Sequence, residues 1–219
     1  MSMWWQWLLF VGMSVMIVVS FVTPAPQQVI GESSRIFYYH IPQAWLAVVA
    51  FGTSMYYSIR YLRSHNPRYD DRAAIANALG LIFAILATVT GAIFAKVTWG
   101  AYWNWDPRQT SIFVLLLIYG AYFSLRGALE VEEKRANLSA VYSIFAFPPA
   151  VFLVFIFPRL FPSLHPSDTV MDKNLKFSMS ADVASILFAS LVLFTILYMW
   201  MLKLAARTSE LERARREEE

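Results

Sequence analysis

Long apolar runs separated by short polar stretches dominate the pattern of this 219-residue chain. A helix that crosses a bilayer needs about 20 predominantly apolar residues. Six runs meet this condition and are predicted to be membrane-spanning helices: 3–22, 41–59, 74–96, 110–127, 139–157 and 183–204. The polar stretches between them are too short to hold an inserted soluble domain. The pattern therefore predicts an all-α polytopic membrane protein with six transmembrane helices.

The composition agrees with this prediction, because 58% of the residues are hydrophobic, whereas soluble domains contain about 45–50% apolar residues. The chain has no cysteine, which excludes disulfides, thiolate metal sites and thioether links. The first run lacks a basic start and a convincing cleavage site, so we expect a retained helix rather than a signal peptide. We expect one transmembrane domain, 1–204, followed by a charged cytoplasmic tail, 205–219.

The placement of lysine and arginine predicts the orientation, because short cytoplasmic loops carry an excess of these residues. Of the 18 lysines and arginines, two thirds fall on the side of the second loop, the fourth loop and the C-terminus. Both termini are therefore predicted to be cytoplasmic (N-in, C-in). The first, third and fifth loops then face outward, which in a bacterium means the periplasmic face of the inner (plasma) membrane.

The third loop, on the predicted outer side, has an unusual density of aromatic rings. Residues 99–109 read WGAYWNWDPRQ. The aromatic belts of membrane proteins account for one or two such residues at an interface, and a larger cluster favours a binding surface for a large, flat, apolar ligand. The rings of this surface are Trp99, Tyr102, Trp103 and Trp105.

Two helix starts are predicted on this side. Asp106 is expected to be an N-cap, Pro107 the first helical residue and Gln109 the partner in a capping box. Because capping accounts for Asp106 fully, we expect a cap there rather than a ligand contact. Pro42 suits the first turn of a helix, which places His40 near an N-cap at the membrane surface.

The histidines suggest what the flat ligand is. His40 and His165 are predicted on the outer side, whereas His65 lies in a cytoplasmic loop. Two imidazoles cannot complete a structural zinc site, which uses four ligands. Copper with Met171 as a soft ligand stays open, but it does not explain the aromatic loop. Haem explains both features, because its iron takes axial imidazoles and its porphyrin packs on aromatic rings.

Haem also carries two propionates, and the planar guanidinium of arginine pairs well with carboxylates. Arg35 lies five residues before His40, and Arg108 directly follows the tryptophans. The alternative for each arginine is contact with lipid headgroups, and the sequence leaves this alternative open.

The run from Trp99 to Asp106, WGAYWNWD, resembles the tryptophan-rich WWD signature of the haem-handling membrane proteins of cytochrome c maturation. Within that superfamily the chain is similar to the CcmC family (haem exporter protein C). The six-helix length, the run PRQTS at 107–111 and the presence of only two outer histidines carry this resemblance. It extends from about Arg35 to the sixth helix, and it departs at Pro107, where CcmC proteins often have alanine.

The resemblance implies a subunit that binds and presents haem rather than an enzyme. It implies haem b held non-covalently between two axial histidines, delivery to the haem chaperone CcmE, and assembly with the ABC-transporter subunits CcmA and CcmB and the small membrane protein CcmD. The chain has no P-loop, so ATP hydrolysis is expected in a partner; no nucleic acid is expected. The site residues would be His40 and His165 as metal ligands, with Trp99, Tyr102, Trp103, Trp105, Arg35 and Arg108 around the haem.

Two other functions stay open. The chain could be a permease that moves haem or another solute across the bilayer, although its predicted spans contain few of the ionisable residues that usually mark transport paths. It could also be a cytochrome c synthase-like member of the WWD superfamily, which would itself attach haem to an apocytochrome.

Overall fold

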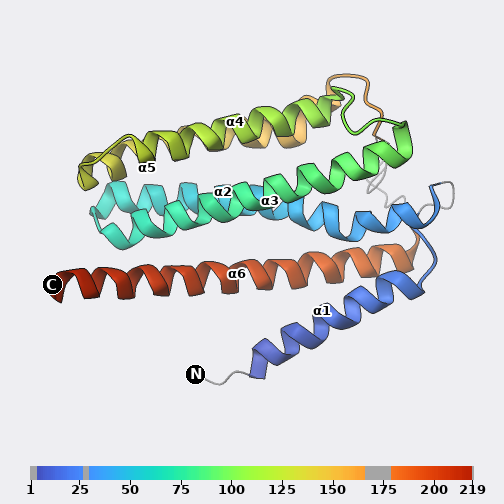
Figure 1. Ribbon diagram of the computed structural model, residues 1–219, viewed down its shortest axis with the longest axis horizontal. Helices are drawn as coiled ribbons and strands as arrows, with labels where there is room; N and C mark the ends of the chain where they lie inside the picture. Colours follow the sequence, from blue (N-terminus) through green and yellow to red (C-terminus); the bar gives the residue numbers. More distant parts are fainter. Residues whose placement is uncertain (1–3, 27–29, 166–178, 219) are drawn as a thin grey trace.

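The computed structural model describes residues 4–26, 30–165 and 179–218, and this part of the chain is helical apart from its connections (Figure 1). A 3₁₀ segment, η1 (Gly31–Ile36), precedes α2, and a π-helical turn, η2 (Phe152–Ile156), and a 3₁₀ turn, η3 (Phe157–Arg159), follow α5. The all-α prediction is confirmed. The α-helices are α1 (Trp4–Val22), α2 (Phe37–Ser64), α3 (Pro67–Trp99), α4 (Pro107–Gly127), α5 (Glu132–Val151) and α6 (Ala181–Glu218).

Five helical segments of the described chain are long and apolar enough to cross a membrane: α1, α3, α4, α5 with its following turns, and α6. The 28-residue α2 is long enough but does not belong to this set. It packs against α3, α5 and α6, so polar side chains such as Ser54 and Ser58 are buried against other helices rather than facing lipid. The chain is thus a polytopic membrane protein, and α2 as a sixth span remains a prediction.

The helices pack in layers, with α2 and α3 between the α4–α5 pair and α6, and with α1 against α6 (Figure 1). In the centre, the ring of Phe51 on α2 stacks on Tyr119 of α4, with ring centroids 3.4 Å apart. Because lipid is as apolar as these side chains, such contacts stabilise the bundle through close packing rather than through the removal of water.

The start of α2 differs from the prediction. The helix begins at Phe37, so Pro42 lies in its second turn and His40 in its first turn rather than at the N-cap. Proline lacks the N–H that would bond to the carbonyl of Tyr38. The hydroxyl of Ser190 on α6 donates to that carbonyl instead, over 2.5 Å. The early helix start therefore creates an acceptor that docks α6 onto α2.

The two ends of the bundle carry different features. The C-terminal ends of α2, α4 and α6 lie together, opposite the connection between α3 and α4 (Figure 1). His65, with φ of 50°, ends α2 there. The segment 205–218, predicted as a charged tail, continues α6 as a helix. Its Arg213 pairs with Asp71 of α3 (2.6 Å) and with Glu132, the first residue of α5 (2.8 Å). These ion pairs hold this helix to the bundle.

Candidate functional site

The tryptophan-rich connection starts where α3 ends. Gly100 adopts a φ of +82°, and its N–H donates to the carbonyl of Lys96. Glycine reaches this left-handed conformation without strain, so it is a favourable helix end. The Lys96 ammonium donates to the Gly100 carbonyl (2.9 Å) and lies 5.6 Å from the ring centroid of Tyr102. Residues 100–106 then lead to α4 without helical structure.

Gln109 organises this connection instead of completing a capping box. Its Oε1 accepts from the N–H of Asn104 (2.7 Å), and its Nε2 donates to the carbonyl of Tyr102 (3.3 Å). The predicted capping box required a hydrogen bond between Gln109 and Asp106, and this part of the prediction is wrong. The other half is confirmed, because Asp106 is the N-cap and Pro107 is the first residue of α4.

Asp106 also joins the connection to the segment that carries His165. Asp106 is buried, with 5% of the residue exposed. It accepts hydrogen bonds from the N–H of Arg108 (2.9 Å), the N–H of Leu164 (2.7 Å), the hydroxyl of Ser163 (2.9 Å) and Nδ1 of His165 (3.1 Å). Asp106 is thus the predicted N-cap, but capping does not account for all of its contacts. The contacts with Ser163, Leu164 and His165 have no local signal in the sequence, because these residues lie more than 50 positions from Asp106.

The charge of Asp106 determines which nitrogen of His165 carries the proton. Burial opposes ionisation, but hydrogen bonds from the N–H groups of Arg108 and Leu164 outweigh it and hold the pKa of Asp106 below its usual range. An ionised carboxylate only accepts, so Nδ1 of His165 donates and Nε2 keeps a lone pair. Burial, together with the positive charge of Arg108, lowers the pKa of His165 despite Asp106. His165 is therefore a neutral imidazole at pH 7.

His40 reaches from α2 to α3, where its Nδ1 lies 3.0 Å from the hydroxyl of Thr90. That hydroxyl also lies within donating distance of the carbonyls of Leu86 (2.8 Å) and Ala87 (3.2 Å). If it gives its proton to one of these carbonyls, its oxygen accepts from Nδ1, and Nε2 of His40 keeps a lone pair. Gly91 makes room for the ring, since a Cβ at this position would lie 3.0 Å from Cε1 of His40. His40 also interacts electrostatically with His165, which places both imidazoles at the same end of the bundle.

The aromatic residues of the connection divide into two groups. Trp99 contacts His165 edge-on, with ring centroids 4.6 Å apart. Trp103 and Trp105 instead pack on each other, with centroids 5.7 Å apart and perpendicular planes. Tyr102 and Trp105 are 59% and 66% exposed. One ring thus belongs to the histidine site, and the others offer an accessible aromatic surface beside it.

Arg35, predicted to bind a propionate, is buried and engaged with the protein. Its guanidinium donates to the carbonyls of Ser20 (2.5 Å) and Thr23 (2.7 Å) at the end of α1. It also pairs with Glu32 (2.6 Å). These contacts hold the end of α1 to η1. Most of the N–H donors of Arg35 therefore form hydrogen bonds within the protein.

Arg108 is in a different position. Its Nε is buried and has no hydrogen-bond partner among the described residues. Its charge acts on both His40 and His165. The nearby carboxylate of Asp106 is already committed to other donors. A half-buried guanidinium whose Nε has no hydrogen-bond partner in this part of the chain favours an anionic ligand at this site.

Together these residues form a site with two imidazoles, a tryptophan beside one of them, and a guanidinium whose Nε has no partner among the described residues. No group of three or more His, Cys, Asp or Glu side chains suited to a metal ion occurs in the described part of the chain. The donor set fits a metal that needs only two protein ligands, as haem iron does. Met171, the soft ligand of the copper alternative, lies outside the described residues.

The chain is similar to a family of known proteins. Residues 1–219 match the family CcmC, described as "Heme exporter protein C". The chain is 32% identical over 114 residues to Heme exporter protein C of Bradyrhizobium diazoefficiens (52% of this chain, 43% of that protein). It is 31% identical over 121 residues to Heme exporter protein C of Rhodobacter capsulatus (55% and 50%). It is 33% identical over 89 residues to cytochrome c biogenesis protein CcsA of Pelargonium hortorum (40% and 28%).

The matched region spans about half the length of these curated Heme exporter proteins C. Their names describe haem export, and that of the more distant relative describes cytochrome c biogenesis.

Proposed function

The chain belongs to the CcmC (Heme exporter protein C) family, and from this premise we propose that it holds haem for cytochrome c maturation. Haem b is the cargo, bound non-covalently at the periplasmic face of the bacterial inner membrane. The chain presents it to a CcmE-type chaperone, in a complex with the ABC-transporter subunits CcmA and CcmB and with CcmD. In this proposal α2 is the sixth span, and both termini are cytoplasmic.

The arrangement of the two histidines carries the proposal. Metal-ligating histidines commonly donate the second ring N–H to an acceptor that fixes the tautomer. Nδ1 of His165 has Asp106 as this acceptor, and Nδ1 of His40 has the hydroxyl of Thr90. With the proton on Nδ1 of each ring, both Nε2 atoms keep the lone pair that an iron requires. His40 and His165 are therefore our proposed axial ligands; haem supplies its own iron and porphyrin chemistry, and the chain binds and orients it.

The surrounding residues have separate proposed roles. Trp99 packs beside the ligand His165 and would contact the porphyrin. The exposed rings of Tyr102 and Trp105, together with the half-buried Trp103, would form the surface on which the chaperone docks. Arg108 would pair with a propionate, because its guanidinium has charge-assisted donors to offer. Arg35 would contribute by holding α1 beside the site, with its remaining N–H available to the second propionate.

The visible spectrum of the purified chain tests this proposal. We expect a Soret band after haem addition, and a weaker or shifted band in His40→Ala and in His165→Ala. His65→Ala is the matched control, because this histidine lies at the other end of α2 and should leave the spectrum unchanged. A wild type that stays colourless after haem addition would refute the haem site, and equal effects of all three substitutions would refute the ligand assignment.

A further inference from the structure

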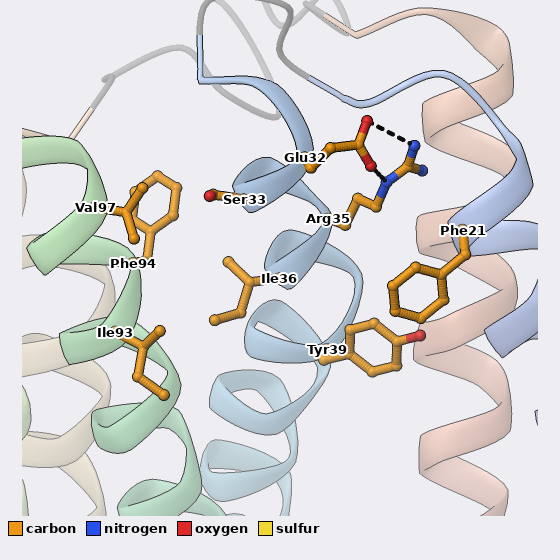
Figure 2. Close-up of a pocket in the computed structure, with 9 residues that line it drawn as sticks. All are labelled: Phe21, Glu32, Ser33, Arg35, Ile36, Tyr39, Ile93, Phe94 and Val97. Atoms are coloured by element: carbon orange, nitrogen blue, oxygen red, sulfur yellow. Dashed lines mark hydrogen bonds and ion pairs between the residues drawn. The ribbon is translucent and has the colours of Figure 1, made fainter.

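A cleft of about 250 Å³ opens between the ends of α1, η1–α2 and α3 (Figure 2). Figure 2 shows Phe21 of α1 on one side and Ile93 and Val97 of α3 on the other, with Ile36 between them. The ion pair of Arg35 with Glu32 lies on the η1 side. The cleft therefore combines apolar walls with one charged border.

The cleft borders the histidine site on two sides. Phe94 lines it, and the ring of Phe94 contacts Trp99, with centroids 5.9 Å apart. Trp99 in turn contacts His165. Across the cleft, Tyr39 lines the α2 side and is the chain neighbour of His40. Two aromatic rings, Phe94 and Trp99, thus lie between the cleft and His165, and Tyr39 directly precedes His40 in the chain.

One side of the cleft is lined by exposed apolar side chains. Phe21 is 62% exposed, Ile93 48% and Val97 55%. All three lie on helices that are long and apolar enough to cross a bilayer. In the membrane these side chains face acyl chains, so an apolar molecule can reach the cleft from the lipid without crossing water.

The end of α1 is the wall of the cleft with the fewest attachments. Among the helices, α1 packs mainly against α6 rather than against α2 or α3. Its end is held to η1–α2 by hydrogen bonds: the hydroxyl of Ser20 with that of Tyr39 (2.7 Å), and Arg35 with two carbonyls. This wall can therefore widen without disturbing the core between α2 and α3.

The cleft is small for a ligand-binding pocket, so its size suits the passage of a ligand better than the holding of one. Ligand pockets usually measure about 300–1,000 Å³, so this cleft accommodates the edge of a porphyrin-sized molecule rather than all of it. Apolar walls with a guanidinium at one border suit a flat apolar ring that carries carboxylates on one edge.

We propose that this cleft is the lateral entrance through which haem passes from the outer leaflet to His40 and His165. The inference rests on the proposed haem function. It adds a route and a direction of entry, and it gives α1 and the contacts of Arg35 a role in loading rather than in ligation.

Loading kinetics test the entrance. The full chain is placed in phosphatidylcholine nanodiscs and mixed with phosphatidylcholine vesicles that contain haemin, and the growth of the Soret band is followed. Ile93→Trp and Val97→Trp fill the cleft and should slow loading and release together by about tenfold, leaving the affinity nearly unchanged. Phe21→Ala widens the cleft and should load at least as fast as wild type. Val89→Trp is the control, since Val89 is 51% exposed on α3 but does not line the cleft.

The outcomes separate the entrance from the function on which it rests. A wild type without a Soret band refutes haem binding, and the entrance is refuted with it. A normal wild-type band with equal loading rates in Ile93→Trp and Val89→Trp refutes the entrance alone. Loss of affinity at an unchanged loading rate also refutes it, because the cleft would then be part of the resting site or a lipid-chain groove.

Discussion

Replacing Asp106 by asparagine isolates its role at the histidine site. Asparagine caps a helix about as well as aspartate, so the start of α4 should remain. The carboxylate uses both oxygens: one accepts from Arg108 and His165, and the other from Leu164. An amide has one acceptor oxygen. In either orientation, therefore, its NH₂ group faces the N–H of Leu164 or Nδ1 of His165.

Two independent magnitudes apply to this change. A hydrogen bond to a charged group contributes about 1.5–3 kcal/mol. Removing the partner that orients a metal ligand typically lowers metal affinity about 10–100-fold, which corresponds to about 1.4–2.7 kcal/mol. The ranges overlap, so Asp106→Asn should weaken haem binding about 10–100-fold, with a Soret band shifted toward that of His165→Ala.

Haem titration followed at the Soret band measures this loss, and circular dichroism checks that the helices are intact. Ser163→Ala is the matched control: it removes one hydrogen bond to Asp106 but keeps those from Leu164 and His165. Its effect on affinity should be much smaller. Wild-type affinity and spectrum in Asp106→Asn would refute the argument that this carboxylate sets the tautomer of His165.

Three further predictions follow from the same contacts. Gly91→Ala should lower haem affinity in the same titration, because the added Cβ would lie 3.0 Å from Cε1 of His40; unchanged binding would show that the imidazole can shift freely. Haem retention should be constant near pH 7 and fall only below about pH 6.5, because the pKa of His165 is lowered and only the neutral ring ligates. A spectrum that already decays between pH 8 and 7 would contradict this. Ser190→Ala should lower the apparent melting temperature, since the buried Tyr38 carbonyl loses a donor at a cost of about 1–3 kcal/mol; an unchanged melting curve would mean that this bond does not dock α6.

The features that the sequence predicted well have local causes. The end of α3 and the start of α4 follow from Gly100 and from the Asp106-Pro107 pair, whose backbone preferences act within one turn. Long apolar runs likewise predict helices because a membrane leaves no other way to satisfy the backbone. The start of α2 was misjudged for the opposite reason: Pro42 is acceptable in the second turn only because Ser190, on a distant helix, bonds to the carbonyl that proline leaves free.

The candidate site shows the same division. The residue types His40, His165, Trp99 and Arg108 were recognisable from the pattern. The contacts of these residues were not predictable, because the hydrogen-bond acceptor for Nδ1 of His165 lies in the connection between α3 and α4. The commitment of Arg35 to the end of α1 was equally invisible, since a buried arginine and a ligand-binding arginine look alike in a sequence.

The sequence by itself determined that this is a helical membrane protein, where most of its helices run, and which side chains are available for metal and carboxylate recognition. These properties depend on hydrophobicity and on backbone preferences that act over a few residues. Only the tertiary structure placed Asp106 and Thr90 beside the two imidazoles, left the Nε of Arg108 without a partner among the described residues, and bound most donors of Arg35 to the protein. It also formed the lateral cleft near this site. Each of these depends on contacts between helices, which pair residues by packing geometry and not by distance along the chain.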